Sequence, residues 1–228
     1  MEKILTADKE IFSIPGYNSL TDNEKELIDS YSNKVSYSNG DVIIKQNTRT
    51  SHIMYIRSGL VKVYKEGRNN KVINLKIALP GSYVGLLSVF GDDIYQYNAS
   101  SIQNAEILFI DVAVFRDIIN QNGTFSAHLI KQISVEGLFV LDKLMNLYHK
   151  QLPGRIADVL LFFSEKIFQS NAFDLPLTRR ELAEFAGTTK ESFIRTLTEF
   201  RNDRIITLER KRVDIISMDI LKTLSRLG

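Results

Sequence analysis

Charged side chains of both signs share one face of a predicted helix near the carboxyl end of the chain. At about 100° per residue, the segment that ends at Phe200 divides into two arcs. The apolar arc holds Phe193, Thr196, Leu197 and Phe200, and the polar arc holds Lys190, Glu191, Ile194, Arg195 and Thr198. The apolar arc can pack, which leaves amine, carboxylate and guanidinium groups to form hydrogen bonds outward. An ordinary amphipathic surface helix has the same division, so the pattern alone does not decide.

Helix-start signals and one glycine surround this face. Thr178 with Glu181 forms a capping-box signature, and Thr188 with Glu191 repeats it for the second helix. Gly187 lies between them and accepts the left-handed conformation that a sharp turn requires. Two capped helices joined at a glycine over residues 177–200 predict a helix-turn-helix, whose second helix enters the major groove of DNA.

Composition sets outer limits on the function. The 228 residues fit one large or two small domains, with 44% hydrophobic and 25% charged residues, as in ordinary globular proteins. The chain has no cysteine, which excludes disulfides, cysteine-ligated zinc and iron–sulfur clusters. No apolar run is long enough to span a membrane, and the N-terminus lacks a secretory core, so we expect a cytoplasmic protein without a membrane partner. Residues 178–212 hold 9 basic and 6 acidic side chains, a modest positive excess on the candidate DNA-binding stretch.

The amino-terminal half has the pattern of a β-rich domain. Thr21 and Glu24 predict one short capped helix before it. Five runs rich in β-branched and aromatic residues then predict strands, at 41–45, 52–57, 60–65, 71–77 and 105–110. Gly- and Asn-containing turn signals separate them. The fold class is therefore α+β, with an antiparallel, jelly-roll-like barrel of two sheets followed by helices.

A long helix is predicted over residues 124–149, after a shorter one that Asp111 caps. Its apolar stripe has the spacing of a helix–helix seam and comprises Leu129, Ile133, Gly137, Val140, Leu144 and Leu147. The helix could lie along its own barrel, but its length slightly favours pairing with a second copy. A close backbone approach would explain glycine at 137, where it costs about 1 kcal/mol relative to alanine.

A hinge and a second domain follow. Pro153 and Gly154 break the chain, and Ile156, Val159, Leu160, Phe163 and Ile167 then form one helical face. After the helix-turn-helix, residues 204–217 predict a hairpin whose tip spans 209–212. Its basic side chains, Arg210, Lys211 and Arg212, suit a phosphate backbone, although a solvated turn would have the same composition.

This order of parts resembles the Crp/Fnr family of bacterial transcription regulators over nearly the whole chain. The specific segments are Gly154-Arg155-Ile156-Ala157, residues 178–183, and 187–197. The resemblance implies a cyclic-nucleotide-binding-like barrel at 1–122, a dimerisation helix at 123–150 and a winged helix-turn-helix at 151–228. It implies a homodimer that binds double-stranded DNA at a near-palindromic operator, and contact with RNA polymerase if the protein is an activator. Whether it activates or represses is not encoded in these residues.

The resemblance also assigns roles on the helix-turn-helix. Glu191 and Arg195 match family positions that read bases, and Lys190 matches a position that meets base or backbone. Arginine can donate twice to guanine, and glutamate can accept from the cytosine amino group. The expected phosphate contacts are Thr178, Arg179, Arg180 and Thr189 together with the wing residues Arg210, Lys211 and Arg212.

The barrel departs from the cyclic-nucleotide pattern. Leu86 follows Gly85 where the family has the glutamate that engages ribose, and no arginine lies near Tyr97 to neutralise the phosphate. Residues 77–115 contain no lysine or arginine, and only Lys131 and Lys143 on the long helix could compensate. Because a buried phosphate needs a cationic partner, the sequence predicts no cAMP binding. It leaves open an apolar pocket for another small molecule, at Gly85, Leu86, Leu87 and Tyr97, or a barrel without a ligand.

The sequence gives little support for a haem, metal or metalloenzyme site. His52, His128 and His149 are isolated, so we expect neither a haem ligand nor a metal site, and no cofactor is predicted. A cupin-type metalloenzyme would need converging histidines, whereas the strand region holds His52 alone. A cyclic-nucleotide sensor with atypical contacts, whose helical tail binds protein, is the other alternative, and the Glu191/Arg195 pair argues against it. We therefore predict a regulator and not an enzyme.

Overall fold

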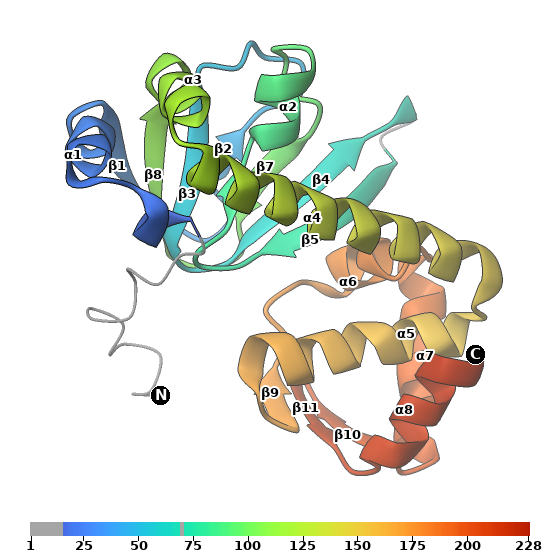
Figure 1. The fold of residues 1–228 in the computed structure, drawn as a ribbon. Helices are drawn as coiled ribbons and strands as arrows, with labels where there is room; N and C mark the ends of the chain where they lie inside the picture. The colour runs from blue at the N-terminus through green and yellow to red at the C-terminus, as the bar shows by residue number, and fades with distance from the viewer. Residues whose placement is uncertain (1–15, 69–70) are drawn as a thin grey trace. The chain divides into compact units, whose positions relative to one another are not determined.

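The computed structural model describes residues 16–68 and 71–228, which form two compact units (Figure 1). Unit 1 holds the described residues up to Arg68 together with Leu75–Leu138, and unit 2 holds Phe139–Gly228 with the short segment that ends at Asn74. The predictions of no secretory signal in residues 1–15 and of a turn at Asn69 and Asn70 lie outside the described residues.

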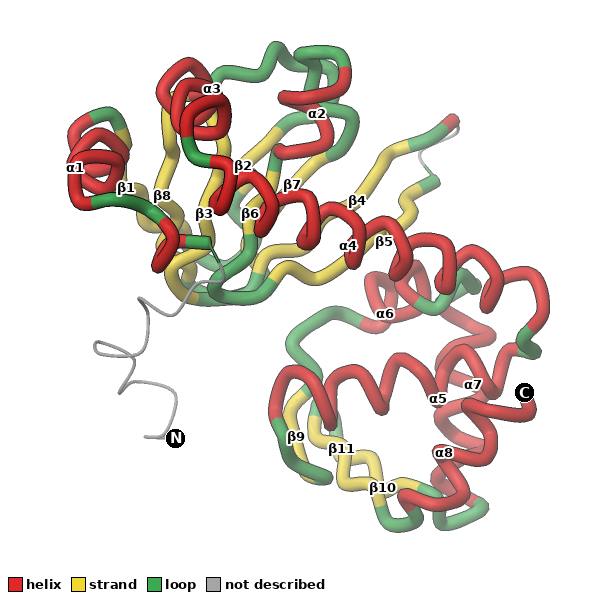
Figure 2. The backbone as a smooth tube through the Cα atoms, in the orientation of Figure 1, coloured by secondary structure: helices red, strands yellow, loops and turns green. Residues whose placement is uncertain are grey.

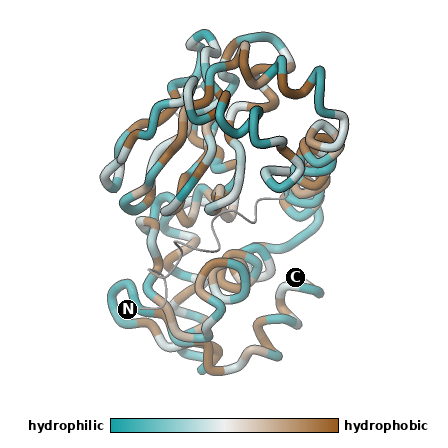
Figure 3. The backbone as a smooth tube through the Cα atoms, turned by 60° about the vertical axis from the view of Figure 1, so that its left-hand side comes forward, coloured by the Kyte–Doolittle hydropathy of each residue, from teal (hydrophilic) through white to brown (hydrophobic). Residues whose placement is uncertain are grey.

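Unit 1 is a barrel of two antiparallel four-stranded sheets. One sheet has the order β1-β8-β3-β6 and the other β2-β7-β4-β5. The strands are β1 (Ser32–Tyr37), β2 (Val42–Ile44), β3 (His52–Ser58), β4 (Val61–Glu66), β5 (Val72–Ala78), β6 (Tyr83–Val84), β7 (Asn98–Ser101) and β8 (Ala105–Asp111). Figure 3 shows hydrophobic segments running through these strands. The predicted α+β class with an antiparallel double-sheet domain is confirmed.

Three strands were not predicted as such. The exposed strand β1 is mostly polar, and β6 is only two residues long. The third, β7, has the sequence NASS, which lacks β-branched and aromatic residues, yet all four residues are buried. It pairs with both β2 and β4, so tertiary pairing and not side-chain propensity determines this strand.

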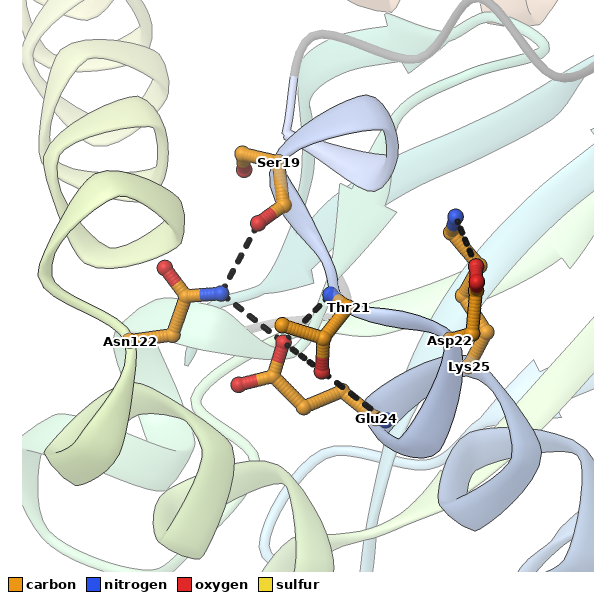
Figure 4. Close-up of polar contacts among 6 residues, drawn as sticks. All are labelled: Ser19, Thr21, Asp22, Glu24, Lys25 and Asn122. Atoms are coloured by element: carbon orange, nitrogen blue, oxygen red, sulfur yellow. Dashed lines mark hydrogen bonds and ion pairs between the residues drawn. The ribbon is translucent and has the colours of Figure 1, made fainter.

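A short helical layer closes the amino-terminal end of unit 1. It begins with η1 (Tyr17–Ser19) and α1 (Asp22–Ser30), and the predicted capping box of Thr21 and Glu24 is confirmed. Figure 4 shows Asn122 pointing at this cap, where its Nδ2 donates to the Ser19 carbonyl and the Glu24 carboxylate, both at 2.8 Å. Asn122 lies between α3 (Val112–Gln121) and α4 (Gly123–His149), so these bonds tie the start of the long helix to α1.

The predicted long helix is confirmed as α4, but its predicted apolar stripe is divided between several environments. Leu129 is 4% exposed and belongs to the core of unit 1, against which Ile133 also packs. Leu147 packs on Gly187 of unit 2, because the Leu147 Cδ2 atom lies 2.2 Å from the position that a Cβ on Gly187 would take. Val140 and Leu144 are exposed, and no atom approaches Gly137 within 4 Å. Leu129 and Leu147 are thus covered by residues of the same chain, whereas Gly137, Val140 and Leu144 remain open to a second copy, so the seam stays a prediction.

A second exposed apolar arc of α4 lies directly beside the predicted stripe. It comprises Ile130, Leu138, Leu141, Met145 and Tyr148, which are 53–84% exposed. At 100° per residue these five positions span an arc of about 80°, with Ser134 at its centre. We call this arc the α4 stripe. Its spacing of threes and fours is that of a helix–helix seam.

Unit 2 packs helices around a small sheet of order β10-β11-β9 (Figure 2). Its elements are α5 (Leu152–Leu161), the π-helix η3 (Phe162–Phe168), β9 (Ala172–Asp174), α6 (Arg179–Phe185), α7 (Lys190–Asn202), β10 (Ile206–Glu209), β11 (Arg212–Ile215) and α8 (Met218–Leu227). Of the predicted face, Ile156, Val159, Leu160 and Phe163 are buried and Ile167 is half-buried. The predicted break at Pro153 and Gly154 is wrong by a few residues, because Pro153 belongs to the first turn of α5 and the chain breaks between His149 and Leu152. Neither β9 nor α8 was predicted.

Candidate nucleic-acid interface

Two helices and a glycine turn position the candidate base-reading residues. Thr178 caps α6 and accepts a hydrogen bond from the Glu181 amide, while the Glu181 carboxylate bonds the Thr178 amide at 2.9 Å. Gly187 has φ +64°, and the Thr188 and Gly187 amides donate to the Ala183 and Glu184 carbonyls. This is a Schellman turn, and its left-handed residue is the predicted glycine.

The second helix starts one residue later than predicted. Thr189 and not Thr188 is the N-cap of α7, and its hydroxyl accepts from the Ser192 amide at 3.2 Å. Both threonines suit an N-cap, so sequence alone could not choose between them. Thr189 therefore already has a partner inside the protein, although its exposed hydroxyl remains at the helix N-terminus.

The division of α7 into two faces is confirmed. Phe193, Thr196, Leu197 and Phe200 are all at most 3% exposed. Lys190, Glu191 and Arg195 are exposed on the opposite side. Arg195 approaches Glu199 at 3.9 Å, an exposed ion pair of the kind that contributes little to stability. The guanidinium group can therefore leave this partner at small cost.

Arg179 joins α6 to the hairpin. Its guanidinium Nη2 donates to the Arg210 carbonyl at 2.6 Å, and burial lowers the pKa of Arg179. The structure thus gives this residue a contact inside the protein in addition to the predicted phosphate contact. Arg180, which is exposed, forms an ion pair with Glu184 at 3.0 Å.

The hairpin turn is shorter than predicted. Glu209 pairs with Arg212 across β10 and β11, so only Arg210 and Lys211 form the exposed tip. Arg210 has φ +52°, a left-handed conformation that costs a non-glycine residue about 1 kcal/mol. Arg212 does not lie at the tip. Its guanidinium is 3.1 Å from the Asp214 carboxylate and 3.8 Å from that of Asp174, which offset its charge.

The barrel residues predicted to line a pocket are only partly brought together. The Gly85 amide donates to the Tyr97 hydroxyl at 2.9 Å, and both Leu86 and Tyr97 are buried. Leu87 differs, because it is 55% exposed on α2 (Leu86–Gly91). Burial raises the pKa of Tyr97 to about 12, so its hydroxyl stays neutral. Tyr97 belongs to a hydrophobic core cluster that also contains Met54, Val63 and Ile107.

The two lysines that could have neutralised a phosphate in the barrel differ in environment. Lys131 is exposed, whereas Lys143 is largely buried in unit 2, with its Nζ 3.9 Å from the centre of the Phe185 ring. Burial lowers the pKa of Lys143 to about 8. The sequence could not reveal this, because Phe185 lies 42 positions away in a separate helix.

Replacing Lys143 with Met should stabilise the protein near neutral pH by about 1–3 kcal/mol. The pKa of Lys143 falls from its ordinary 10.5 to about 8 on folding, so the unfolded chain binds its proton more tightly. The wild-type free energy of unfolding should therefore rise with pH between about 8 and 10.5, and the advantage of Lys143→Met should shrink over the same interval.

Urea unfolding at pH 7 and pH 10 measures this difference. Lys166→Met, which changes an exposed lysine of the same unit, is the control and should show no such pH dependence. Parallel pH profiles for wild type and Lys143→Met would contradict the assignment.

The structure also bears on metal sites and membrane spans. Among the described residues, no group of three or more His, Cys, Asp or Glu side chains is placed to hold a metal ion. Across residues 16–68 and 71–228, no helix is both long and apolar enough to cross a membrane.

Comparison with known proteins matches both units to the same kind of protein. Residues 34–122 match the cyclic nucleotide-binding domain family, and residues 154–224 match the Crp-like helix-turn-helix domain family. The chain therefore belongs to the Crp/Fnr family of transcription regulators, and its helix-turn-helix is a DNA-binding domain.

Individual relatives are distant. The anaerobic regulatory protein of Bacillus subtilis is 23% identical over 81% of this chain and 79% of its own length. The CRP-like cAMP-activated global transcriptional regulator of Mycobacterium tuberculosis is 24% identical over 84% of this chain and 88% of its own. A Crp/Fnr-family regulator from Eubacterium rectale has a similar fold, with a TM-score of 0.79 and 18% identity over 96% of this chain and all of that one. The relatives are regulators of transcription and not enzymes, as expected for this chain.

Proposed function

We propose that this protein is a cytoplasmic homodimer that binds a near-palindromic operator in a sequence-specific manner. In this proposal the sensor domain is assigned to residues 1–122, the dimerisation helix to 123–150 and the DNA-binding domain to 151–228. The observation that carries the proposal is the exposed pair of Glu191 and Arg195, four residues apart on α7, opposite a fully packed face. Side chains of this kind on a second helix suit guanine and cytosine edges in the major groove.

Phosphate contacts are proposed around this pair. Thr178 and Thr189 lie at the N-termini of α6 and α7, where main-chain amides and the helix dipole favour anions. Arg179, Arg180, Arg210 and Lys211 supply positive charge nearby. Arg212 stays in the proposal with a reduced role, since Asp174 and Asp214 already partner it.

The proposed dimer seam joins the exposed members of the predicted stripe, Gly137, Val140 and Leu144, to the neighbouring α4 stripe. The five large apolar side chains of the α4 stripe would otherwise remain in contact with water. Gly137 lies at the edge of this stripe and has open space around it, which would let a second helix approach closely. A two-fold dimer presents two copies of α7 to two half-sites about one helical turn of DNA apart. RNA polymerase would be a further partner if the protein is an activator.

Arg195→Ala should cost about 1–3 kcal/mol of operator binding and relax the preference for bases at one position in each half-site. Arg179→Ala should instead weaken all DNA sequences alike, because its proposed partner is phosphate. Competitive binding to the operator and to scrambled DNA measures both effects. Arg201→Ala, an exposed arginine near the end of α7, is the matched control and should change neither. Equal losses on operator and scrambled DNA in the Arg195 and Arg179 variants would refute the assigned roles.

Control by cAMP is not part of the proposal. Leu86 lies where the family has its ribose-binding glutamate, and the Gly85 amide is already bonded to Tyr97. Calorimetric titration of the whole protein with cAMP should show no binding at micromolar concentration. A micromolar dissociation constant would instead favour the alternative of a cyclic-nucleotide sensor with atypical contacts, which the match of residues 34–122 supports.

A further inference from the structure

One large apolar side chain lies on the outward face of α7. Within this helix, which the structure describes in full, Ile194 is the only large apolar residue that is exposed, at 40%, whereas Phe193, Leu197 and Phe200 are buried. Isoleucine is a weaker helix former than lysine, arginine or glutamate, so Ile194 is not needed to stabilise α7. A single exposed apolar side chain is ordinary on a protein surface, and its exposure does not by itself indicate a function.

The position of Ile194 on the helix is what distinguishes it. At 100° per residue it lies within the arc bounded by Lys190 and Arg195, about 30° from the centre of that arc. It is the fifth residue of α7, and the N-terminal residues of a recognition helix are those that contact base edges. If Glu191 and Arg195 reach bases as proposed, Ile194 therefore enters the major groove beside them.

The chemistry of an isoleucine side chain limits the base that it can contact. The side chain has no donor or acceptor, so packing it against an amino group or a carbonyl oxygen of a base would leave that group without a partner. The C5-methyl group of thymine is the one apolar group that the four bases of DNA present in the major groove. Thymine is therefore the base that this side chain fits.

The residue one turn further along α7 does not supply a competing donor. Thr198 donates its hydroxyl proton to the Ile194 carbonyl at 3.0 Å. A threonine hydroxyl has a single proton, so Thr198 cannot at the same time donate to a base edge beside Ile194. The contact that this part of the helix offers a base is therefore mainly apolar.

We propose that Ile194 is a specificity-determining residue that contacts the C5-methyl group of a thymine in each half-site. This rests on the proposed function, and it adds an apolar reader to the polar side chains Lys190, Glu191 and Arg195. Burial of one methyl group should raise affinity about fourfold in each half-site, and about 15-fold over both half-sites of a two-fold operator.

The test replaces thymine with deoxyuridine, which removes the C5-methyl group and leaves the hydrogen-bonding groups of the base unchanged. The DNA is the operator that the full-length protein selects from a random pool, with its thymines replaced one symmetric pair at a time. For wild type, replacement of one such pair should lower affinity about 15-fold. Ile194→Ser keeps a similar helix propensity and removes the apolar contact, so the same replacement should change its affinity less than about twofold.

A matched control and the opposing outcomes complete the test. Ile220→Ser changes an isoleucine of similar exposure, 47%, on α8 and should keep the wild-type sensitivity to deoxyuridine. The inference is overturned if no thymine pair is sensitive in wild type, or if Ile194→Ser keeps the wild-type sensitivity. Either result would leave selective operator binding, and with it the proposed function, intact. A protein that selects no sequence would instead overturn the proposed function and this inference together.

Discussion

Leu141→Asp should convert the dimer to a monomer and lower operator affinity by roughly 100-fold or more. Leu141 is 58% exposed at the middle of the α4 stripe, between Leu138 and Met145. In a two-fold seam the two introduced carboxylates would face each other in a dry interface, where unpaired charge is costly. A monomer would then bind each half-site separately and lose the gain in effective concentration.

Light scattering and operator titration measure these two effects. Leu87→Asp makes the same change at a leucine of similar exposure on α2, and should leave the protein dimeric with operator affinity unchanged. A Leu141→Asp protein that remains dimeric would show that the seam lies elsewhere. A monomer that keeps full operator affinity would contradict the two-fold mode of binding.

Phe163→Ala should destabilise unit 2 by about 3–5 kcal/mol. The Phe163 side chain has no exposed surface and is the centre of an aromatic cluster. Its ring centre lies 5.6 Å from that of Phe162 and 6.4 Å from those of Phe168 and Phe173. These contacts connect η3 to β9, which is itself paired with the wing strand β11. Removing the ring leaves a cavity where the helices meet the sheet.

Hydrogen exchange of the unit 2 amides measures the loss of stability in unit 2. It does not require that both units unfold together. Phe139→Ala, at a phenylalanine that is 38% exposed in the same unit, is the control and should cost much less. Similar losses for the two variants would show that the aromatic cluster is not the core of this unit.

Local signals predicted the helix-turn-helix well. The Thr178 cap, the Gly187 turn and the packed face of α7 each depend on residues within one or two turns of helix, so their spacing was sufficient. The cap of α7 was displaced by one residue because two adjacent threonines fit the same role. The strand β7 could not be predicted, since its small polar residues are held by pairing on both sides.

The features that the sequence did not predict depend on contacts between residues far apart in the chain. α4 has two apolar stripes, and periodicity alone cannot tell which one its own chain covers. The chain buries Leu129 of the first stripe but leaves Val140 and Leu144 of the same stripe exposed, as it does Leu141 of the second. Arg212 and Arg179 have partners at Asp174 and at the Arg210 carbonyl, 38 and 31 positions away. No pattern around either arginine indicates these partners.

The central claim is sequence-specific binding of DNA by a two-fold dimer. It is tested most directly by selecting bound sequences from a random double-stranded DNA pool with the full-length protein. The selected DNA should share an inverted repeat with half-site centres about 10 base pairs apart, and Arg195→Ala should relax one position in each half. An unenriched pool, or a single half-site without a symmetric partner, would contradict the claim.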